Sequence, residues 1–250
     1  MKKNLVSIIL PNYNSSKYIN KTILSILNQT LRDWRLIIVD DNSNIETKNE
    51  LKKFKKINKI KIFFLNKNRG AGYCRNFALQ KINSEYIAFI DSDDIWEKNK
   101  LKSQIDFMRK NNYSFTYTYY KTFSESSKKV NLIKPLRNFT FEKFTKNTSI
   151  GTSTMIIKSS IAKNLKFINT KICEDYFYKC QLLKKIKFAY CFPFFLTYYQ
   201  IRKNSLQSSK IRNFYWIWKI NKNYNKFNFF KNFFSLFFIS FNSLKKYGFK

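Results

Sequence analysis

The stretch "EYIAFIDSDDIW" (residues 85–96) joins a short apolar run to three aspartates within four positions, Asp91, Asp93 and Asp94. Like charges this close repel one another and resist burial, so packing does not explain them. The chain is otherwise poor in acid, with 15 Asp and Glu against 48 Lys and Arg and a formal net charge of +33. We therefore expect a positively charged group to lie among these three carboxylates.

Short apolar runs alternate with helical patterns upstream of this stretch. The predicted strands are residues 5–10, 35–39, 59–65 and 85–90. The predicted helices are one that follows Ser15 or Ser16 as its cap and two more at about 46–56 and 69–82. This alternation is typical of an α/β fold with a doubly wound parallel sheet and helices on both faces.

The pattern becomes mixed downstream of residue 98. The predicted elements are a helix near 98–111, a strand at 113–120, a loop at 124–129, a strand at 153–158, a helix at 173–186 and strands at 187–190 and 195–201. We divide the 250 residues into a nucleotide-binding half (1–104), a mixed half of the same domain (105–210) and a helical C-terminal segment (211–250). A hydrophobic content of 44% excludes a disordered chain despite the charge.

Polar clusters follow three of the predicted strands, at residues 11–14, 40–43 and 91–94. Ligands of such sheets bind beyond the carboxyl ends of the strands, so these clusters predict a site at one edge. Asp91 and Asp93 point to the same side of an extended chain. Their oxygens suit Mg²⁺ or Mn²⁺, which share coordination with substrate phosphates. A metal–diphosphate would complement both the acids and the lysines.

Several residue types restrict the chemistry. The chain has no histidine, which excludes histidine metal sites, Ser-His-Asp triads and a histidine base. Ile95 follows Asp94 where a DxDxT phosphatase motif requires threonine. The four cysteines form no CxxC pair, so we expect reduced thiols. Asp40 and Asp41 either accept hydrogen bonds from a base or ribose, or cap the next helix through an Asx-turn.

As an ordered set, "VSIILPNYNSS", "RLIIVDDNS", "NRGAGYCRNFALQ" and "FIDSDDIW" resemble the family 2 glycosyltransferases, which have a GT-A fold and a DxD motif. The resemblance is strong over residues 5–96 and continues through "CEDY" (173–176) and "YYQIRKNSLQSS" (198–209). It implies inverting transfer of a hexosyl or N-acetylhexosaminyl group from a nucleotide donor, a UDP-sugar in the first instance. The acceptor would be a glycan or polyprenyl-linked molecule in surface polysaccharide or lipopolysaccharide biosynthesis, and the cofactor Mn²⁺ or Mg²⁺.

The resemblance also implies roles for individual residues. Pro11, Tyr13 and Asn14 would frame the base pocket, Asp41 would contact the uracil, and Asp40 would lie beside it. Arg75 and Asn76 would lie on the donor side, Asp91 on ribose or metal, and Asp93 with Asp94 on the metal–diphosphate. Arg202 and Lys203 would stabilise the leaving group, and Asp175 would be the catalytic base. The family's usual Gly after the paired acids is Asn42 here, and the distal motif lacks the histidine of many relatives.

Two of these assignments have simpler alternatives. Acidic residues such as Asp175 are favoured in a first helical turn by the helix dipole alone. The lysine excess has three explanations: codon composition in an AT-rich genome, nucleic-acid binding, or contact with an anionic membrane.

The C-terminal segment is aromatic and basic. Phenylalanines recur at three- and four-residue steps, namely Phe229, Phe230, Phe233, Phe234, Phe237 and Phe238. Such a helix either packs on its own domain or, with flanking lysines, lies on an anionic membrane surface. Interleaved aromatics and lysines also leave open a single-stranded nucleic-acid-binding protein, and the acids leave open a sugar nucleotidyltransferase. Nucleic-acid binding leaves "DSDD" and "CEDY" unexplained, so we expect no nucleic-acid partner.

The N-terminal apolar run is too short for a signal peptide, and no stretch reaches about 18 apolar residues. We therefore expect a cytoplasmic protein, peripheral on the inner face of the cell membrane if the C-terminal segment docks there.

Overall fold

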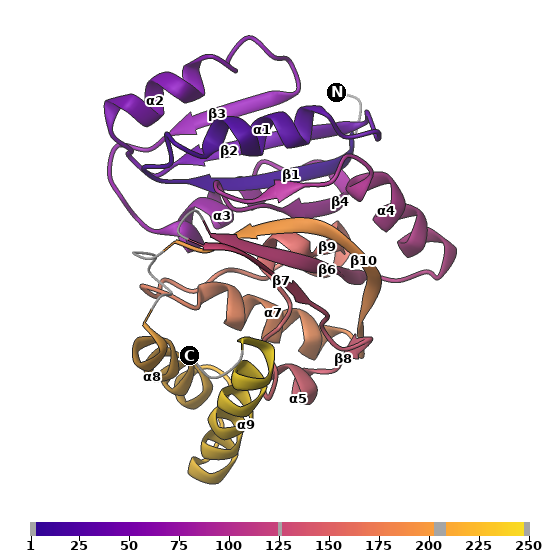
Figure 1. The fold of residues 1–250 in the computed structure, drawn as a ribbon, viewed down its shortest axis with the longest axis vertical. Helices are drawn as coiled ribbons and strands as arrows, with labels where there is room; N and C mark the ends of the chain where they lie inside the picture. Colours follow the sequence, from indigo (N-terminus) through magenta and orange to yellow (C-terminus); the bar gives the residue numbers. More distant parts are fainter. Residues whose placement is uncertain (1–3, 125–126, 203–208, 248–250) are drawn as a thin grey trace.

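A computed structural model describes residues 4–124, 127–202 and 209–247 (Figure 1). Its centre is a ten-stranded sheet in the order β3-β2-β1-β4-β9-β6-β10-β5, with β7 beside β6 and β8 beside β10. The strands are β1 (Asn4–Asn12), β2 (Trp34–Asp40), β3 (Ile60–Phe64), β4 (Ser84–Phe89), β5 (Ile95–Trp96), β6 (Phe115–Ser124), β7 (Ser127–Ile133), β8 (Asn138–Phe139), β9 (Ile156–Lys158) and β10 (Ala189–Gln200).

Helices connect these strands and cover the sheet. They are α1 (Ile19–Leu27), α2 (Ile45–Lys52), α3 (Ala71–Leu79), α4 (Lys100–Lys110), α5 (Phe141–Phe144), α6 (Ser159–Ala162), α7 (Glu174–Lys185), α8 (Lys210–Asn223), α9 (Phe229–Tyr247) and a 3₁₀ turn, η1 (Thr152–Thr154). Among the residues described, no helix is long and apolar enough to cross a membrane.

Strands β3, β2, β1 and β4 are parallel and are linked by α1, α2 and α3, which confirms the predicted doubly wound part of the sheet. β9 then pairs antiparallel with both β4 and β6, and β6 pairs parallel with β10. The mixed half therefore continues the same sheet. The carboxyl ends of β1, β2 and β4 lie at one edge of the sheet, as we predicted from the polar clusters that follow these strands.

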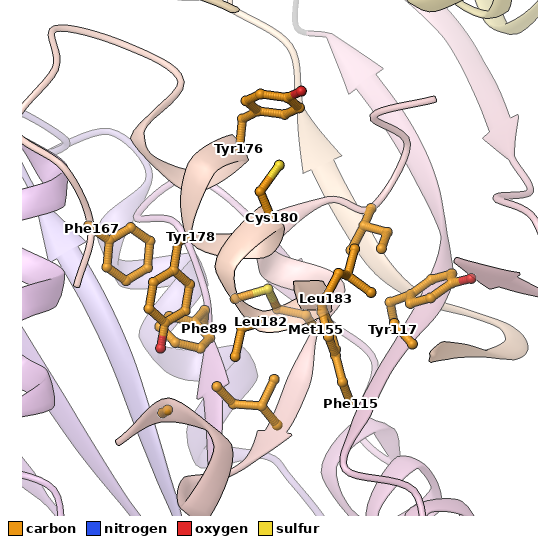
Figure 2. Packing of buried hydrophobic residues seen from close by; sticks show 14 of the residues in the cluster. Phe89, Phe115, Tyr117, Met155, Phe167, Tyr176, Tyr178, Cys180, Leu182 and Leu183 are labelled. Atoms are coloured by element: carbon orange, nitrogen blue, oxygen red, sulfur yellow. The ribbon is translucent and has the colours of Figure 1, made fainter. Parts of the chain in front are cut away.

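The apolar strands bury side chains on both faces, as parallel sheets require. Ile8 on β1 faces a core formed with α1, α2 and α4, whereas the adjacent Ile9 faces a second core formed with α3 and α7. In the second core, Tyr178 of α7 stacks on Phe167 with ring centroids 3.9 Å apart and meets Phe89 of β4 edge-on (Figure 2). Helix α7 is therefore held firmly beneath the sheet edge.

Three local expectations are wrong. The serine-rich stretch at 124–129 is not simply a loop, because Ser124 and Ser127 pair across the β6–β7 hairpin. The two short strands after residue 187 are one strand, β10, with irregular register near Phe195. Neither serine caps α1: its N-cap is Tyr18, without a side-chain cap, and the Ser15 hydroxyl instead donates to Asn12.

Candidate active site

Side chains join the ends of β1 and β2. Asn12 Nδ2 donates to Asp40 Oδ1 at 2.7 Å, and the backbone N–H of Ser43 donates to Asp40 Oδ2 at 3.0 Å. The Ser43 hydroxyl adds a third hydrogen bond, of 2.5 Å, to Oδ1. Asp40 is fully buried, so these bonds supply what water would otherwise provide. The carboxylate of Asp40 thus stabilises the turn after β2, but the helix that follows is capped by Asn44 and not by Asp40.

Asp41 ties the same turn to the start of α3. Its two carboxylate oxygens accept the backbone N–H groups of Arg69 and Gly70, each at 2.7 Å, and the side chain is almost fully buried. Gly70 has φ +88°, a conformation that a side chain would strain. Asn42 has φ +60°, the left-handed turn in which asparagine can replace glycine. The contact of Asp41 with a base remains a prediction.

The other predicted base-pocket residues lie on the loop after β1. Pro11 is buried within the strand opposite Val39, while Tyr13 is 49% exposed. Asn14 has φ +45°, and its Oδ1 accepts the N–H of Asn44 at 2.9 Å. The loops after β1 and β2 are therefore interlocked and present the Tyr13 ring to solvent at the sheet edge.

The three aspartates after β4 have different surroundings. Asp94 is almost fully buried, where it accepts the Ser153 hydroxyl on Oδ2 and the Gln200 N–H on Oδ1 at 3.0 Å. Burial and the carboxylates of Asp93 and Asp91 raise its pKa well above the ordinary range. Asp94 therefore joins β4, η1 and β10 within the protein.

Arg75 of α3 is a positively charged group that contacts the cluster of aspartates after β4, as we expected from the sequence. Its guanidinium is buried between Asp91 Oδ1, at 2.7 Å, and Glu174 Oε1, at 2.6 Å. Burial opposes its charge, but these carboxylates more than offset this and raise the pKa of Arg75. A Cβ at Gly72 would lie 3.0 Å from the Ile168 carbonyl and 3.1 Å from Glu174 Cγ, so glycine allows α3 to approach α7 closely.

Asn76 makes a purely internal contact. Its amide donates to the Phe167 carbonyl and accepts the Phe167 N–H, both at 2.8 Å. The same Phe167 ring lies 5.3 Å from the Arg75 guanidinium. Asn76 thus holds the backbone that supports Arg75, while its donor-side role is untested.

Asp93 pairs with the second arginine of the site. Arg202 Nη2 lies 2.6 Å from Asp93 Oδ2, and its guanidinium lies 5.3 Å from the Tyr18 ring. Burial raises the pKa of Asp93 to about 6 against the opposing charge of Arg202. Lys203, predicted beside it, lies outside the described residues.

Asp175 lies in the first turn of α7 and is held through one oxygen. Thr152 Oγ1 donates to Asp175 Oδ2 at 2.7 Å, and Lys179 Nζ donates to the same atom at 2.7 Å. Lys179 also donates to Thr152 Oγ1 at 3.0 Å. Burial alone would raise the pKa of Asp175, but Lys179 and Arg75 hold it well below its usual range. No residue in the described part of the chain donates to Oδ1.

The carboxylates do not form a ready-made metal cage. Across residues 4–124, 127–202 and 209–247, no group of three or more His, Cys, Asp or Glu side chains has the geometry of a metal site. Mg²⁺ and Mn²⁺ are, however, commonly bound by one or two carboxylates together with substrate phosphates and water. Asp93 and Asp91 fit that smaller donor set.

Four residues of this site were not selected from the sequence: Glu174, Thr152, Ser153 and Lys179. Glu174 lies 99 positions from Arg75, and no local pattern connects them. Lys179 follows Asp175 by four residues, a spacing that places the two on one helix face and could have been recognised.

Comparison with known sequences shows that this protein is similar to glycosyltransferases. The family model described as Glycosyl transferase family 2 matches residues 7–172. TuaG of Bacillus subtilis, whose name assigns it to teichuronic acid biosynthesis as a glycosyltransferase, is 33% identical over 231 residues and 92% of each chain. WfgD of Escherichia coli, named UDP-Glc:alpha-D-GlcNAc-diphosphoundecaprenol beta-1,3-glucosyltransferase, is 34% identical over 222 residues, 88% of this chain and 86% of WfgD.

Solved structures share the fold. S. aureus TarS 1–349, in complex with UDP-GlcNAc, has a TM-score of 0.72 at 22% identity over 86% of this chain, which spans 65% of that TarS chain. The mannosyltransferase PcManGT of Pyrobaculum calidifontis, in complex with GDP-Man and Mn²⁺, has a TM-score of 0.71 at 14% identity over 91% of this chain and 66% of that one.

The fold is that of the GT-A glycosyltransferases, with the acid cluster at the carboxyl edge of its parallel strands. The chain belongs to glycosyl transferase family 2 and is a glycosyltransferase.

Proposed function

We propose that this protein is an inverting glycosyltransferase that uses a UDP-sugar and a divalent metal ion to extend a glycan or lipid-linked acceptor. The observation that carries the proposal is the Asp91–Arg75–Glu174 chain of ion pairs, which joins the end of β4 to the start of α7. These two ion pairs hold Asp91 close to Glu174, the neighbour of Asp175. A reaction between a bound diphosphate and an acceptor hydroxyl would require the metal-binding and base carboxylates to lie close together in this way.

Residues 1–104 would bind the donor. The interlocked loops after β1 and β2 offer the Tyr13 ring to a nucleotide base, beside Pro11, Asn14, Asp40 and Asp41. Because Asp40 and Asp41 already accept internal hydrogen bonds, they would act chiefly by fixing the shape of this pocket.

Asp93 and Asp91 would hold Mn²⁺ or Mg²⁺ against the donor diphosphate. The metal ion would stabilise the charge that develops on the leaving diphosphate. Arg202 forms an ion pair with Asp93, and this pairing supports a role in which Arg202 would contact the same phosphates. Lys203 follows it in the sequence and would add a second cation.

Residues 105–210 would bind the acceptor and supply the base. The acceptor oxygen would attack the anomeric carbon, the bond from that carbon to the diphosphate oxygen would break, and Asp175 would take the hydroxyl proton. Oδ2 is held by Thr152 and Lys179, which leaves Oδ1 to accept that proton.

The named relatives suggest a cellular setting. WfgD is named for a diphosphoundecaprenol acceptor and TuaG for teichuronic acid biosynthesis, and we propose surface polysaccharide assembly at the cytoplasmic side of the membrane as the setting. Family membership favours this activity over the nucleic-acid-binding and nucleotidyltransferase alternatives.

A thermal-shift panel tests the proposal. UDP-, GDP-, dTDP- and CMP-sugars are compared, each with and without Mn²⁺, and transfer is then followed by release of the nucleoside diphosphate. We expect UDP-sugars to stabilise the protein only with metal. Metal-independent stabilisation would contradict the metal role, and consumption of a nucleoside triphosphate with release of pyrophosphate would indicate a nucleotidyltransferase.

A further inference from the structure

Helix α9 presents a row of phenylalanines to solvent. Its members are Phe229, Phe230, Phe233, Phe234, Phe237, Phe238 and Phe241, each between 37% and 72% exposed. At about 100° per residue they occupy about half of the helix circumference. At about 200 Å² per phenylalanine they expose about 800 Å² of apolar surface, which exceeds the largest patch of a typical monomer. We call these seven residues the phenylalanine face.

The opposite side of α9 is fixed to the domain by polar and apolar contacts. Asn232 Oδ1 accepts from Asn221 of α8 at 3.1 Å, and the Ser235 hydroxyl donates to the Thr145 carbonyl at 2.6 Å. Ile239 is buried in the core beside them. A surface helix ordinarily buries its most apolar side, whereas α9 buries Asn232 and Ser235 together with Ile239 and leaves seven phenylalanines exposed. The hydrogen bonds of Asn232 and Ser235, with the burial of Ile239, therefore hold α9 with the phenylalanine face outward.

The charge of the C-terminal segment that carries this face has one sign. No Asp or Glu follows Asp175, whereas 15 Lys and Arg do. Exposed cations on the same hairpin include Lys222, Lys226 and Lys231. The surface thus combines a large apolar area with positive charge, and its partner must offer an apolar phase bordered by anions.

We propose that the α8–α9 hairpin docks the protein on an anionic lipid bilayer. The phenylalanine face enters the boundary between headgroups and acyl chains, and the lysines contact the anionic headgroups. A second copy of this chain would bring a further charge of +33 and no acid to the interface. Phenylalanine has no polar atom for a nucleic-acid backbone, and seven adjacent rings on one helix leave few cations between them.

The hairpin is coupled to the catalytic half of the molecule. The Tyr176 hydroxyl of α7 donates to Asn221 Oδ1 at 2.8 Å, and Lys184 donates to Asn225 Oδ1 at 2.9 Å. Figure 1 shows the hairpin at the end of the molecule remote from α2, with α7 between it and the sheet. Since Asp175 lies in the first turn of α7, docking would hold the acceptor half at the lipid surface. This last step rests on the proposed function, whereas bilayer binding does not.

Vesicle flotation of the full chain tests the docking. The vesicles are phosphatidylcholine alone, or phosphatidylcholine with about one third phosphatidylglycerol. We expect binding to the anionic vesicles, at least about tenfold weaker binding to the neutral ones, and a similar loss for the Phe233→Ser/Phe237→Ser variant. Because both rings are more than half exposed, the variant should keep the melting temperature of the parent.

Matched variants distinguish binding through the phenylalanine face from nonspecific binding by any exposed aromatic ring. Phe194→Ser removes an equally exposed ring on β10 and should bind like the parent. Phe233→Trp/Phe237→Trp should also retain binding, because tryptophan suits the interface. Equal binding of the serine variant and the parent would overturn the proposal. So would an absence of vesicle binding combined with self-association or oligonucleotide binding that needs these phenylalanines.

The membrane-docking proposal and the proposed function can be refuted independently of each other. Donor stabilisation is measured without vesicles, and the phenylalanine variants should retain it. A protein that binds vesicles but no donor refutes the function alone, and one that binds donor but no vesicles refutes the docking alone.

Discussion

At the residue scale, Asp175 combines two properties that a base in this reaction needs. Thr152 and Lys179 fix Oδ2, so the carboxylate keeps one orientation toward an incoming hydroxyl. Its depressed pKa keeps it ionised over the whole physiological range. The same depression makes it a weak base, so proton transfer should accompany rather than precede attack on the anomeric carbon.

Replacement of Asp175 by asparagine should separate donor binding from transfer. Asp175→Asn preserves shape and removes the proton acceptor, so we expect transfer to fall by about 10²-fold or more. Donor affinity, measured by calorimetry with Mn²⁺, should stay within a factor of about two. Asp106→Asn, on the exposed face of α4, is the control. Retained turnover in a coupled assay would remove Asp175 from the mechanism.

Asp93→Asn should act on the donor instead. One negatively charged oxygen next to Arg202 is lost, and with it a proposed metal ligand. We expect metal-dependent donor affinity to fall by at least about tenfold, the lower end for disturbed metal sites. Calorimetric titration with and without Mn²⁺ measures it, with Asp106→Asn again as the control. An unchanged affinity in the presence of Mn²⁺ would contradict the metal role.

At the element scale, α7 places the cation of Lys179 one turn after Asp175, the proposed base. Lys179→Met removes that cation, so the pKa of Asp175 should rise toward the ordinary carboxylate range. Activity that needs ionised Asp175 is lost as pH falls through this pKa, so the acid limb of the pH–rate profile should move to higher pH. A merely structural role for Lys179 would lower the melting temperature and leave the limb unmoved.

Helix α4 carries a lysine without a carboxylate partner in the described part of the chain. Lys100 is fully buried and donates to Gln104 Oε1 at 2.7 Å, with its ammonium 4.7 Å from the Trp96 ring. Burial lowers the pKa of Lys100 from 10.5 to about 7. Between these values the unfolded chain binds a proton that the folded chain does not. The free energy of unfolding should therefore rise with pH above 7.

Urea titrations of the parent and Lys100→Met between about pH 7 and pH 9 measure this contribution. We expect the parent to gain on the order of a few kcal/mol relative to the variant across the window. Parallel pH dependences would mean that Lys100 is charged in the folded protein throughout. Lys110→Met, on the exposed end of α4, controls for loss of a lysine.

Elements with a strong local pattern could be predicted, and those that depend on distant contacts could not. Predominantly apolar runs identified β1, β2 and β4, because burial on both faces favours apolar residues along most of each strand. β7 was missed because it begins with the polar residues Ser-Lys-Lys at 127–129 and, among the described strands, pairs with β6 alone, at the margin of the sheet. For α9 the phenylalanine spacing predicted a helix, but its orientation depends on the hydrogen bonds of Asn232 and Ser235 with α8 and Thr145.

In the candidate site, too, the positions of residues could be predicted from local sequence, whereas their contacts with distant residues could not. The sequence placed Asp41, Asp91 and Asp94 at the sheet edge, because each directly follows or soon follows a strand. It could not indicate that Asp41 and Asp94 accept internal hydrogen bonds, since their partners Gly70 and Gln200 come from other parts of the chain. Long-range contacts of this kind have no signature in a single sequence.

At the scale of the whole molecule, the charge of +33 is a stability term in its own right. Seven of the 15 acids lie at the site, such as Asp91 and Asp93 with their arginines, so most lysines have no acidic partner and repel one another across water. Such self-repulsion disfavours the compact state, and salt screens it because the Debye length falls from about 30 Å at 0.01 M to about 3 Å at 1 M.

The melting temperature should therefore rise by several degrees as sodium chloride increases from about 0.01 M to about 0.5 M. Differential scanning fluorimetry without donor or metal measures it. Choline chloride should give the same rise as sodium chloride, because screening depends on ionic strength and not on a bound cation. A melting temperature that falls with salt would mean that the ion pairs of the site, Arg75 with Glu174 above all, stabilise the fold more than the surface charge destabilises it.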